Sequence, residues 1–250
     1  MRNRSRYLIV LTLISLCSAL GWAQAGGSND QAIQDKAAKM LSSNKKWQGV
    51  TASTEDGVVT LTGNVKLYID SLDAAKKVGK IDKVQGVRNH ITVDTTVPDQ
   101  ELFQKIADKL AYDRVGQGIT FNMLTLQVKD GVATVGGDVH DYVSRDSALA
   151  IVETTPGVKD VIDNINVLPT SGFDDDLRIR IARAIYGYPA MKKYAIDPQR
   201  PIRIIVDNGH VTLYGVVDNK MDSQIAETQA RTVSGSFSVE NKLVIANQGK

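Results

Sequence analysis

The sequence predicts an α+β fold made of three tandem small domains, each with two helices packed on a three-stranded sheet. Three observations lead to this prediction. A hairpin pattern occurs three times, an amphipathic helical pattern precedes each copy, and a second helix and a short strand follow it. The hairpin patterns are DGVVTLTGNV from Asp56, DGVATVGGDV from Asp130 and NGHVTLYGVV from Asn208.

The spacing of the copies sets the size of the repeating unit. The turn glycines of the three hairpins, Gly57, Gly131 and Gly209, lie 74 and 78 residues apart. This spacing is too long for a solenoid repeat and suits a small domain. We therefore predict domains at residues 29–97, 98–169 and 172–247.

The first predicted element of each unit is an amphipathic helix. An acidic residue suited to a helix N-cap or first turn begins each pattern, and apolar residues follow at intervals of four that form one helical face. The acids are Asp30, Asp99 and Asp174, and the apolar residues are Ile33, Ala37 and Leu41, then Leu102, Ile106 and Leu110, then Leu177, Ile181 and Ile185.

A hairpin follows each first helix. Strand patterns at about residues 50–54, 124–128 and 202–206 lead into Asp-Gly or Asn-Gly, a pair that accepts the positive φ angles of a tight turn. The returning strand alternates apolar residues with threonine, which predicts one buried face. A second glycine near the strand end, at 63, 137 and 215, predicts a bulge, a bend or a close backbone approach.

A second helix and a last strand complete each unit. Alanines at equal offsets from the turn, Ala74, Ala148 and Ala226, lie in the second helix. The last strands begin near residues 87, 161 and 239. We align the asparagines Asn89, Asn164 and Asn241 with one another, and the glycines Gly86, Gly157 and Gly235 with one another.

The N-terminal segment has the order of a secretory signal peptide. Three arginines precede an uncharged apolar run at residues 7–20, and Ala-Gln-Ala ends at Ala25. We predict cleavage after Ala25, and the alternatives are a buried helix or a retained anchor. After cleavage the chain has 27 basic and 28 acidic residues, no cysteine and no further membrane-spanning segment. This charge balance argues against nucleic acid as a partner.

The repeated pattern resembles the BON family of bacterial envelope domains. The residues that carry the resemblance are Gly57 to Gly63, Gly131 to Gly137 and Gly209 to Gly215, together with the glycine and asparagine positions aligned above. The resemblance implies a non-catalytic periplasmic module, similar to the osmotically inducible proteins, that binds phospholipid surfaces or envelope proteins. It supplies no ligand residues that can be transferred to this chain.

No pattern in the chain indicates an active site. The three histidines, His90, His140 and His210, occupy different positions of the unit, so they do not form a repeated site. Asp174 to Asp176 is interpreted as a linker entering a helix N-terminus rather than a metal cluster. The hairpin glycines lack the lysine and helix start of a phosphate-binding loop. We predict no enzyme activity, no metal and no cofactor.

Basic and aromatic residues that follow the first helix are the candidate contact residues for lipid or protein. Aromatic rings suit the headgroup region and lysines suit anionic lipid, but core packing of Trp47 and Tyr194 is the alternative. The outward side chains of the third hairpin are further candidates for protein contact. The candidates are Lys45, Lys46, Trp47, Tyr188, Lys192, Lys193, Tyr194, His210 and Tyr214.

Overall fold

The computed structural model describes residues 24–113, 118–196 and 201–246. The predicted signal peptide lies outside these ranges except for Gln24 and Ala25, which begin the first helix. Within the described ranges, no helix combines the length and the apolar character that a membrane span requires.

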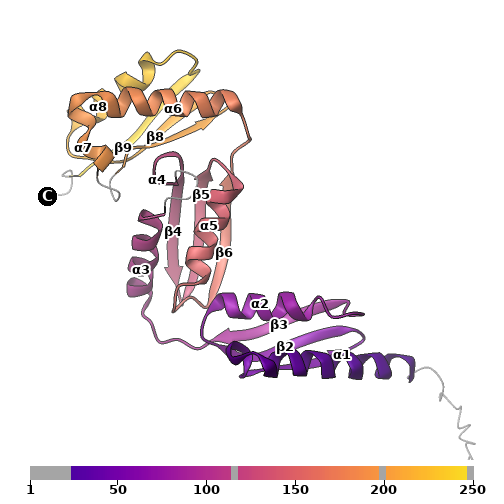
Figure 1. Ribbon diagram of the computed structural model, residues 1–250. Coiled ribbons are helices and arrows are strands. Elements are labelled where there is room, and N and C mark those ends of the chain that lie inside the picture. Colours follow the sequence, from indigo (N-terminus) through magenta and orange to yellow (C-terminus); the bar gives the residue numbers. More distant parts are fainter. Residues whose placement is uncertain (1–23, 114–117, 197–200, 247–250) are drawn as a thin grey trace, which may run out of the picture.

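The chain forms three successive α+β units, each with the predicted order of helix, hairpin, helix and strand (Figure 1). The first unit contains α1 (Gln24–Ser43), η1 (Lys45–Trp47), β1 (Val50–Glu55), β2 (Val58–Val65), α2 (Tyr68–Val78) and β3 (Gly86–Val93). The second contains α3 (Asp99–Ala111), α4 (Gly118–Phe121), β4 (Met123–Lys129), β5 (Val132–Val139), α5 (Tyr142–Glu153) and β6 (Asp160–Val167). The third contains α6 (Gly172–Gly187), η3 (Pro189–Met191), α7 (Lys193–Ile196), β7 (Arg203–Asp207), β8 (His210–Val217), α8 (Lys220–Thr232) and β9 (Ser238–Ile245).

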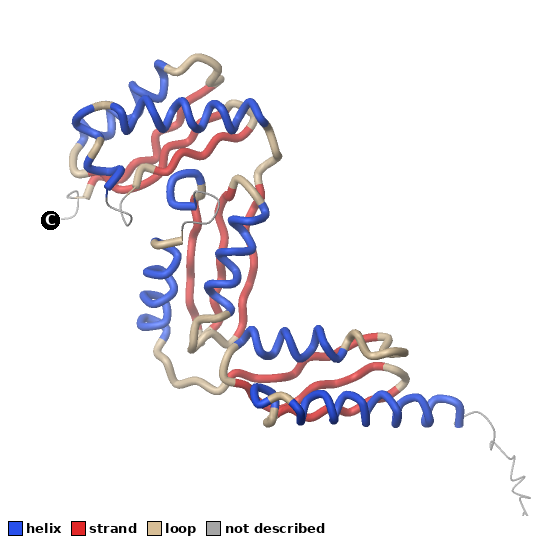
Figure 2. Tube along the Cα trace, in the orientation of Figure 1, coloured by secondary structure: helices blue, strands red, loops and turns tan. Residues whose placement is uncertain are grey.

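Each unit has one three-stranded sheet with the returning hairpin strand in the centre. The orders are β1-β2-β3, β4-β5-β6 and β7-β8-β9. The central strand pairs antiparallel with its hairpin partner and parallel with the last strand, because the second helix carries the chain back to the starting end of the sheet. Figure 2 shows the three units in succession, with the strands of the middle unit running across the direction of the strands in its neighbours.

The helices cover one face of each sheet because the strands alternate in polarity. In β2, Val59 and Leu61 are fully buried, whereas Thr60 and Thr62 between and after them point to the other face. Each first helix turns its predicted stripe inward, as Ile33, Ala37 and Leu41 of α1 show. The opposite face of each sheet is left uncovered by helices of its own unit.

An acid of each first helix binds the hairpin turn of the same unit. Asp174 Oδ2 and Oδ1 accept hydrogen bonds from the backbone N–H groups of Asn208 and Gly209, at 3.0 and 2.8 Å. Asp30 and Asp99 bind their turns in the same way. Asp99 and Asp174 lie in the first turns of their helices, as predicted. For Asp30 that prediction was wrong, because α1 begins at Gln24 and Asp30 is its seventh residue. The bonds that the three acids make to the turns were not foreseen from the sequence.

The second hairpin glycine allows a close backbone approach. Gly63 has φ +120°, and a Cβ atom there would collide with the carbonyl oxygen of Gly49, the residue before β1. Gly137 and Gly215 have the same geometry against Met123 and Pro201. Of the three alternatives predicted for this glycine, the close approach is the one that the structure shows.

Two alignments made from the sequence were wrong. The strand register places Asn89 opposite Leu61, and the corresponding partner of Val135 is Asp163, not Asn164. Gly86 begins β3. Gly157 and Gly235 instead lie in the turn before the last strand of their units and have positive φ. The residue of the first unit at the same place in that turn is Lys83, with φ +69°. In both cases an identical residue lay close to the equivalent position and misled the alignment.

Candidate interaction surfaces

The predicted pair Lys46 and Trp47 holds the start of α2. The Trp47 indole N–H donates to the backbone oxygen of Asp70 at 2.8 Å, and the Lys46 ammonium lies 2.9 Å from the Asp70 carboxylate. Asp70 is buried, and Trp47 is only 3% exposed. The hydrogen bond to Asp70, followed by the charge of that carboxylate, raises the pKa of Lys46.

The third unit builds the same arrangement from Lys193 and Tyr194. The Tyr194 hydroxyl donates to the buried Asp222 carboxylate at 2.6 Å and accepts from the Asp218 backbone N–H at 2.8 Å. Lys193 lies 2.6 Å from Asp218 and 2.7 Å from Asp222, and its hydrogen bonds to these two carboxylates raise its pKa. Burial is the largest cause of the raised pKa of Tyr194.

These two arrangements bear on the role of the aromatic rings. Trp47 and Tyr194 are each 3% exposed and belong to the hydrophobic cores of their units. Their polar groups point at a helix start within the same unit. The geometry therefore favours core packing for the two rings and leaves the lysines beside them at the surface.

Lys45 and Lys46 line a shallow cavity of about 660 Å³ on the first unit. Lys66 lies on the same cavity, and so do two carboxylates, Asp70 and Asp94. The mixture of charges balances much of the positive potential of the lysines. The cavity is therefore a weakly basic surface rather than a defined anion site.

His210 and Tyr214 both point outward from β8, four residues apart, but have different surroundings. The His210 ring lies 2.8 Å from the Ser238 hydroxyl and meets the Phe237 ring edge-on, with centroids 5.9 Å apart. The Lys242 ammonium lies 5.5 Å from the centroid of the Tyr214 ring. The structure thus places His210 at the turn end of the third unit and Tyr214 further along the open sheet face.

Exposed apolar side chains gather at the opposite end of the third unit. Val216 and Val244 are register partners on β8 and β9, and Tyr194 joins α7 to the start of α8 at this end (Figure 1). We call this surface the apolar end and define it by Tyr188, Ile196, Val216, Met221 and Val244, which are 40, 81, 39, 69 and 62% exposed.

Lysines lie in the same segments as several residues of the apolar end. Lys192 lies between η3 and α7, Lys193 begins α7, and Lys220 begins α8 beside Met221. Of these residues, the sequence pattern had singled out Tyr188, Lys192 and Lys193. The others come from three segments that no local pattern connects, so only the folded chain brings them together.

The units meet at two junctions of different construction. At the first, Tyr68 of α2 packs against the cores of both the first and second units and lines a cavity together with Asp160 at the start of β6. At the second, α4 packs on β7, and Arg203 donates to the backbone oxygen of Asn122 at 2.9 Å. A cavity of about 290 Å³ beside this junction is lined by His140, Asp175 and Arg178, among others.

The titratable groups do not converge on one place. His90 lies on the exposed face of β3 and His210 at the end of the third unit, whereas His140 is half-buried against Asn122 and Asp141. Among the residues that the structure describes, no group of three or more histidine, cysteine, aspartate or glutamate side chains could hold a metal ion.

Comparisons with known proteins identify the repeated unit. A family model described as BON domain matches residues 29–95, 98–169 and 189–247. A comparison with curated proteins finds no match.

Two solved structures are distantly similar to this chain. CdsD, a structural protein of the Type III secretion system of Chlamydia trachomatis, is 13% identical over 86% of this chain and 91% of its own, with a TM-score of 0.24. The periplasmic domain of the inner membrane protein PrgH from S. typhimurium is 12% identical over 84% of this chain and 98% of its own, with a TM-score of 0.18. At such TM-scores neither likeness supports a conclusion about this chain.

Proposed function

This chain belongs to the BON domain family, and we propose on that basis that it is a non-enzymatic periplasmic protein that associates with phospholipid surfaces, in osmotic or envelope stress. The proposed location rests on the N-terminal order of arginines, apolar run and small residues, which is typical of a secretory signal. The proposed absence of catalysis rests on the scattered titratable groups and on the family resemblance.

The observation that carries the lipid proposal is the apolar end of the third domain. Ile196, Met221 and Val244 are each more than 60% exposed, so their apolar surface is available to a bilayer interface. Lys192 and Lys220 stand beside them, where each lysine near an anionic surface contributes about 1 kcal/mol at most. Burial of the apolar side chains in the interface adds roughly 25 cal/mol for each Å² removed from water. The expected binding is peripheral, reversible and sensitive to salt.

Cosedimentation with lipid vesicles tests this proposal. Residues 26–250 are mixed with vesicles of phosphatidylethanolamine and phosphatidylglycerol, or of phosphatidylcholine alone, at low and at physiological salt. We expect pelleting with the anionic vesicles that weakens as salt rises. Absence of pelleting under every condition would exclude the lipid proposal.

Matched variants assign the binding to the apolar end. The double variant Ile196→Ser and Val244→Ser removes two of its most exposed side chains, and we expect the bound fraction to fall several-fold. The control is Tyr112→Ser and Ile162→Ser on the second domain, which are 57 and 46% exposed in the natural chain. Equal losses in the two variants would contradict the assignment.

A protein-interaction or chaperone-like module of the periplasm is the second candidate function. In each sheet the last strand, such as β9, lies at an edge and pairs on one side only. Crosslinking in intact cells, followed by mass spectrometry, distinguishes the two candidates. Recovery of the same protein in repeated experiments, together with no vesicle binding, would favour this second function.

A further inference from the structure

The first junction supplies a pattern against which the second can be compared. At the first junction, Tyr68 begins α2 and reaches Asp160, which begins β6 of the next domain. Burial, followed by the Asp160 carboxylate, raises the pKa of Tyr68 to about 12. Tyr68 and Asp160 also line a cavity together with Ile91 and Lys159. One end of the first domain thus meets the turn end of the second domain (Figure 1).

The second junction leaves the corresponding residues uncovered. The residue of the second domain that is equivalent to Tyr68 is Tyr142, the first residue of α5, and it is 68% exposed. Val143 beside it is 60% exposed. The equivalent of Asp160 in the third domain is Ser238, the first residue of β9. The second domain instead contacts the third through α4 and β7.

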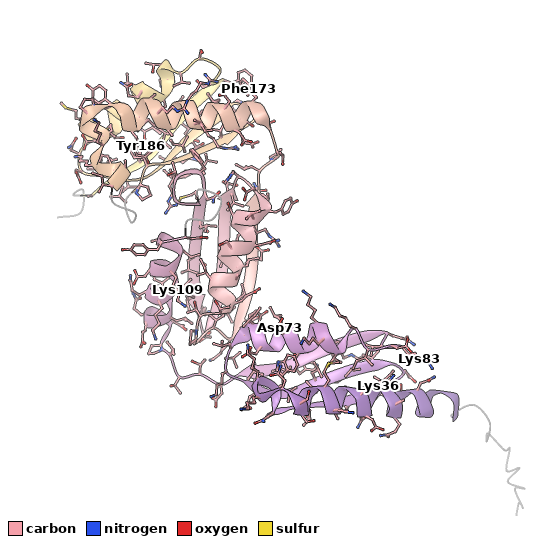
Figure 3. All side chains as sticks on the ribbon, in the orientation of Figure 1. Lys36, Asp73, Lys83, Lys109, Phe173 and Tyr186 are labelled. Atoms are coloured by element: carbon pink, nitrogen blue, oxygen red, sulfur yellow. The ribbon has the colours of Figure 1, made fainter. Side chains whose placement is uncertain are left out.

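The turn end of the third domain carries an exposed aromatic pair. Phe237 occupies the position equivalent to Lys159 and is 74% exposed. It stacks on Phe173, which is 49% exposed and lies at the start of α6, with centroids 6.5 Å apart (Figure 3). Two large exposed aromatic rings at the end of a domain are typical of a surface that binds another protein surface.

We propose that the Tyr142–Val143 surface of the second domain is a docking surface for the Phe173–Phe237 end of the third domain of the same chain. The docked arrangement repeats the head-to-tail contact of the first junction. It buries the four side chains that are left exposed when α4 rests on β7. The chain therefore alternates between two arrangements of its third domain.

The connecting segments allow this movement. Between β3 and α3 there are five residues, and between β6 and α6 there are four. The acid that binds the hairpin turn is the first residue of α3, Asp99, but the third residue of α6, Asp174. The length of chain between the last strand and this acid is therefore nearly the same at both junctions. A covalent link of this length also favours the third domain of the same chain over that of a second copy.

Charges across the docked junction favour contact. At the first junction, Asp73 of α2 lies near Glu153 of α5, and burial together with this like charge raises the pKa of Glu153 (Figure 3 labels Asp73). The equivalent positions at the second junction are Ser147 and Arg231, which do not repel. The docked arrangement thus lacks a repulsion that the first junction tolerates.

Chemical crosslinking tests the proposal, because residues 26–250 contain no natural cysteine. The variant Tyr142→Cys with Ser238→Cys is treated with a short bis-maleimide at low protein concentration. A disulfide is unsuitable because it requires Cα atoms within about 7 Å of each other. A tyrosine side chain can reach its partner across a longer Cα separation. The positive control is Tyr68→Cys with Asp160→Cys, and the negative control is Tyr112→Cys with Ser238→Cys.

We expect an intrachain product in the Tyr142–Ser238 variant at a yield about ten-fold above the negative control. Adding Phe237→Ser should lower that yield several-fold, because it removes the ring that the docked arrangement buries. A yield equal to the negative control, while the positive control reacts, would overturn the proposal. Products that are only dimeric and increase with protein concentration would also overturn it, in favour of a second copy.

Discussion

Gly209 donates its backbone N–H to Asp174 across a 2.8 Å hydrogen bond that joins the third hairpin turn to the start of α6. The same bond occurs between Gly131 and Asp99, and between Gly57 and Asp30. In each domain the carboxylate also accepts from the residue before the glycine. The turn sequence and the helix acid therefore work as one unit, which explains why both recur.

We predict that Asp30→Asn destabilises the first domain. The amide has one acceptor oxygen, so one of the two turn N–H groups loses its carboxylate partner, at a cost of about 1–2 kcal/mol. Trp47 is the single tryptophan of residues 26–250, so its fluorescence during urea unfolding reports this domain. Asp174→Asn is the matched control and should leave the Trp47 transition unchanged. A similar shift in both variants would mean that the domains do not unfold separately.

Lys83 stands at a backbone position where the other two domains have glycine. Its φ is +69°, in the left-handed region, whereas Gly157 and Gly235 occupy the equivalent turn (Figure 3 labels Lys83). We predict that Lys83→Gly stabilises the first domain by about 0.5–1 kcal/mol, because relief of the Cβ strain exceeds the added entropy of the unfolded chain. The readout is again Trp47 fluorescence in urea.

A second variant separates backbone strain from the side chain of Lys83. The Lys83 ammonium lies 2.9 Å from the side-chain oxygen of Asn29, and both groups are exposed. Lys83→Ala removes this contact but keeps the Cβ atom, so it should be less stable than Lys83→Gly. If Lys83→Ala were as stable as Lys83→Gly or more so, the strain at the positive φ would not exceed the entropy that glycine adds to the unfolded chain, and the prediction would be contradicted.

Much of the fold follows from local pattern. The alternation in β2 and the stripe of Ile33, Ala37 and Leu41 each depend on residues close in sequence, so both elements could be predicted. The bonds of Asp30 to the turn could not, because 26 residues separate Asp30 from Asp56. A sequence pattern suggests a helix start for such an acid and does not reveal a distant backbone partner.

The candidate surfaces were less predictable than the fold. Lys193 and Tyr194 stand out as a basic and aromatic pair, yet the folded chain directs both toward Asp222. Ile196 and Val244 stand in unrelated segments, and only the folded chain brings α7 and the end of β9 to the same end of the third domain. Exposure of apolar residues is a property of the completed fold, so composition alone does not locate it.

His140 makes the second domain sensitive to mildly acidic pH. Burial is the largest cause of its lowered pKa, and Arg178 across the junction adds to this effect against the opposing charges of Asp141 and Asp175. Because the pKa in the folded state lies below the unfolded value of about 6.5, the unfolded chain binds the proton first. We predict that stability is retained above that value and falls as pH decreases below it.

The variant His140→Gln isolates this contribution. The intensity of the Gly136 amide signal in two-dimensional NMR spectra, recorded through a urea titration, reports unfolding of the second domain. Between pH 7 and pH 5 the natural chain should lose more stability than His140→Gln. His90→Gln, on the exposed face of β3, is the control and should keep the full dependence on pH. Parallel behaviour of all three chains would contradict the assignment.

The second helix and the last strand of each domain share a side-chain contact, which is a neutral hydrogen bond in two domains and an ion pair in the second domain. In the first and third domains an asparagine amide donates to a serine hydroxyl, from Asn89 to Ser71 at 2.8 Å and from Asn241 to Ser223 at 2.9 Å. At the equivalent positions the second domain has Asp163 and Arg145, with Nε to Oδ2 at 3.0 Å.

The other oxygen of the strand residue keeps its role in all three domains. Oδ1 of Asn89, Asp163 and Asn241 accepts from the backbone N–H two residues later, at 3.2, 3.0 and 3.1 Å. The domains therefore differ at these two positions in the contact with the helix and not in the bond to the strand backbone. Serine at position 145 and asparagine at position 163 should therefore be tolerated together in the second domain.

We predict that Arg145→Ser and Asp163→Asn each lower the free energy of unfolding, and that the double variant loses less than the sum of the two single losses. Arg145→Ser leaves the Asp163 carboxylate without its guanidinium, and Asp163→Asn leaves the guanidinium without its carboxylate. The double variant restores a matched serine and asparagine. Because both side chains are partly exposed, we expect a coupling free energy of only about 0.5–1.5 kcal/mol. The Gly136 amide signal in urea measures it for all four chains, and purely additive effects would show that the two positions do not act as a pair.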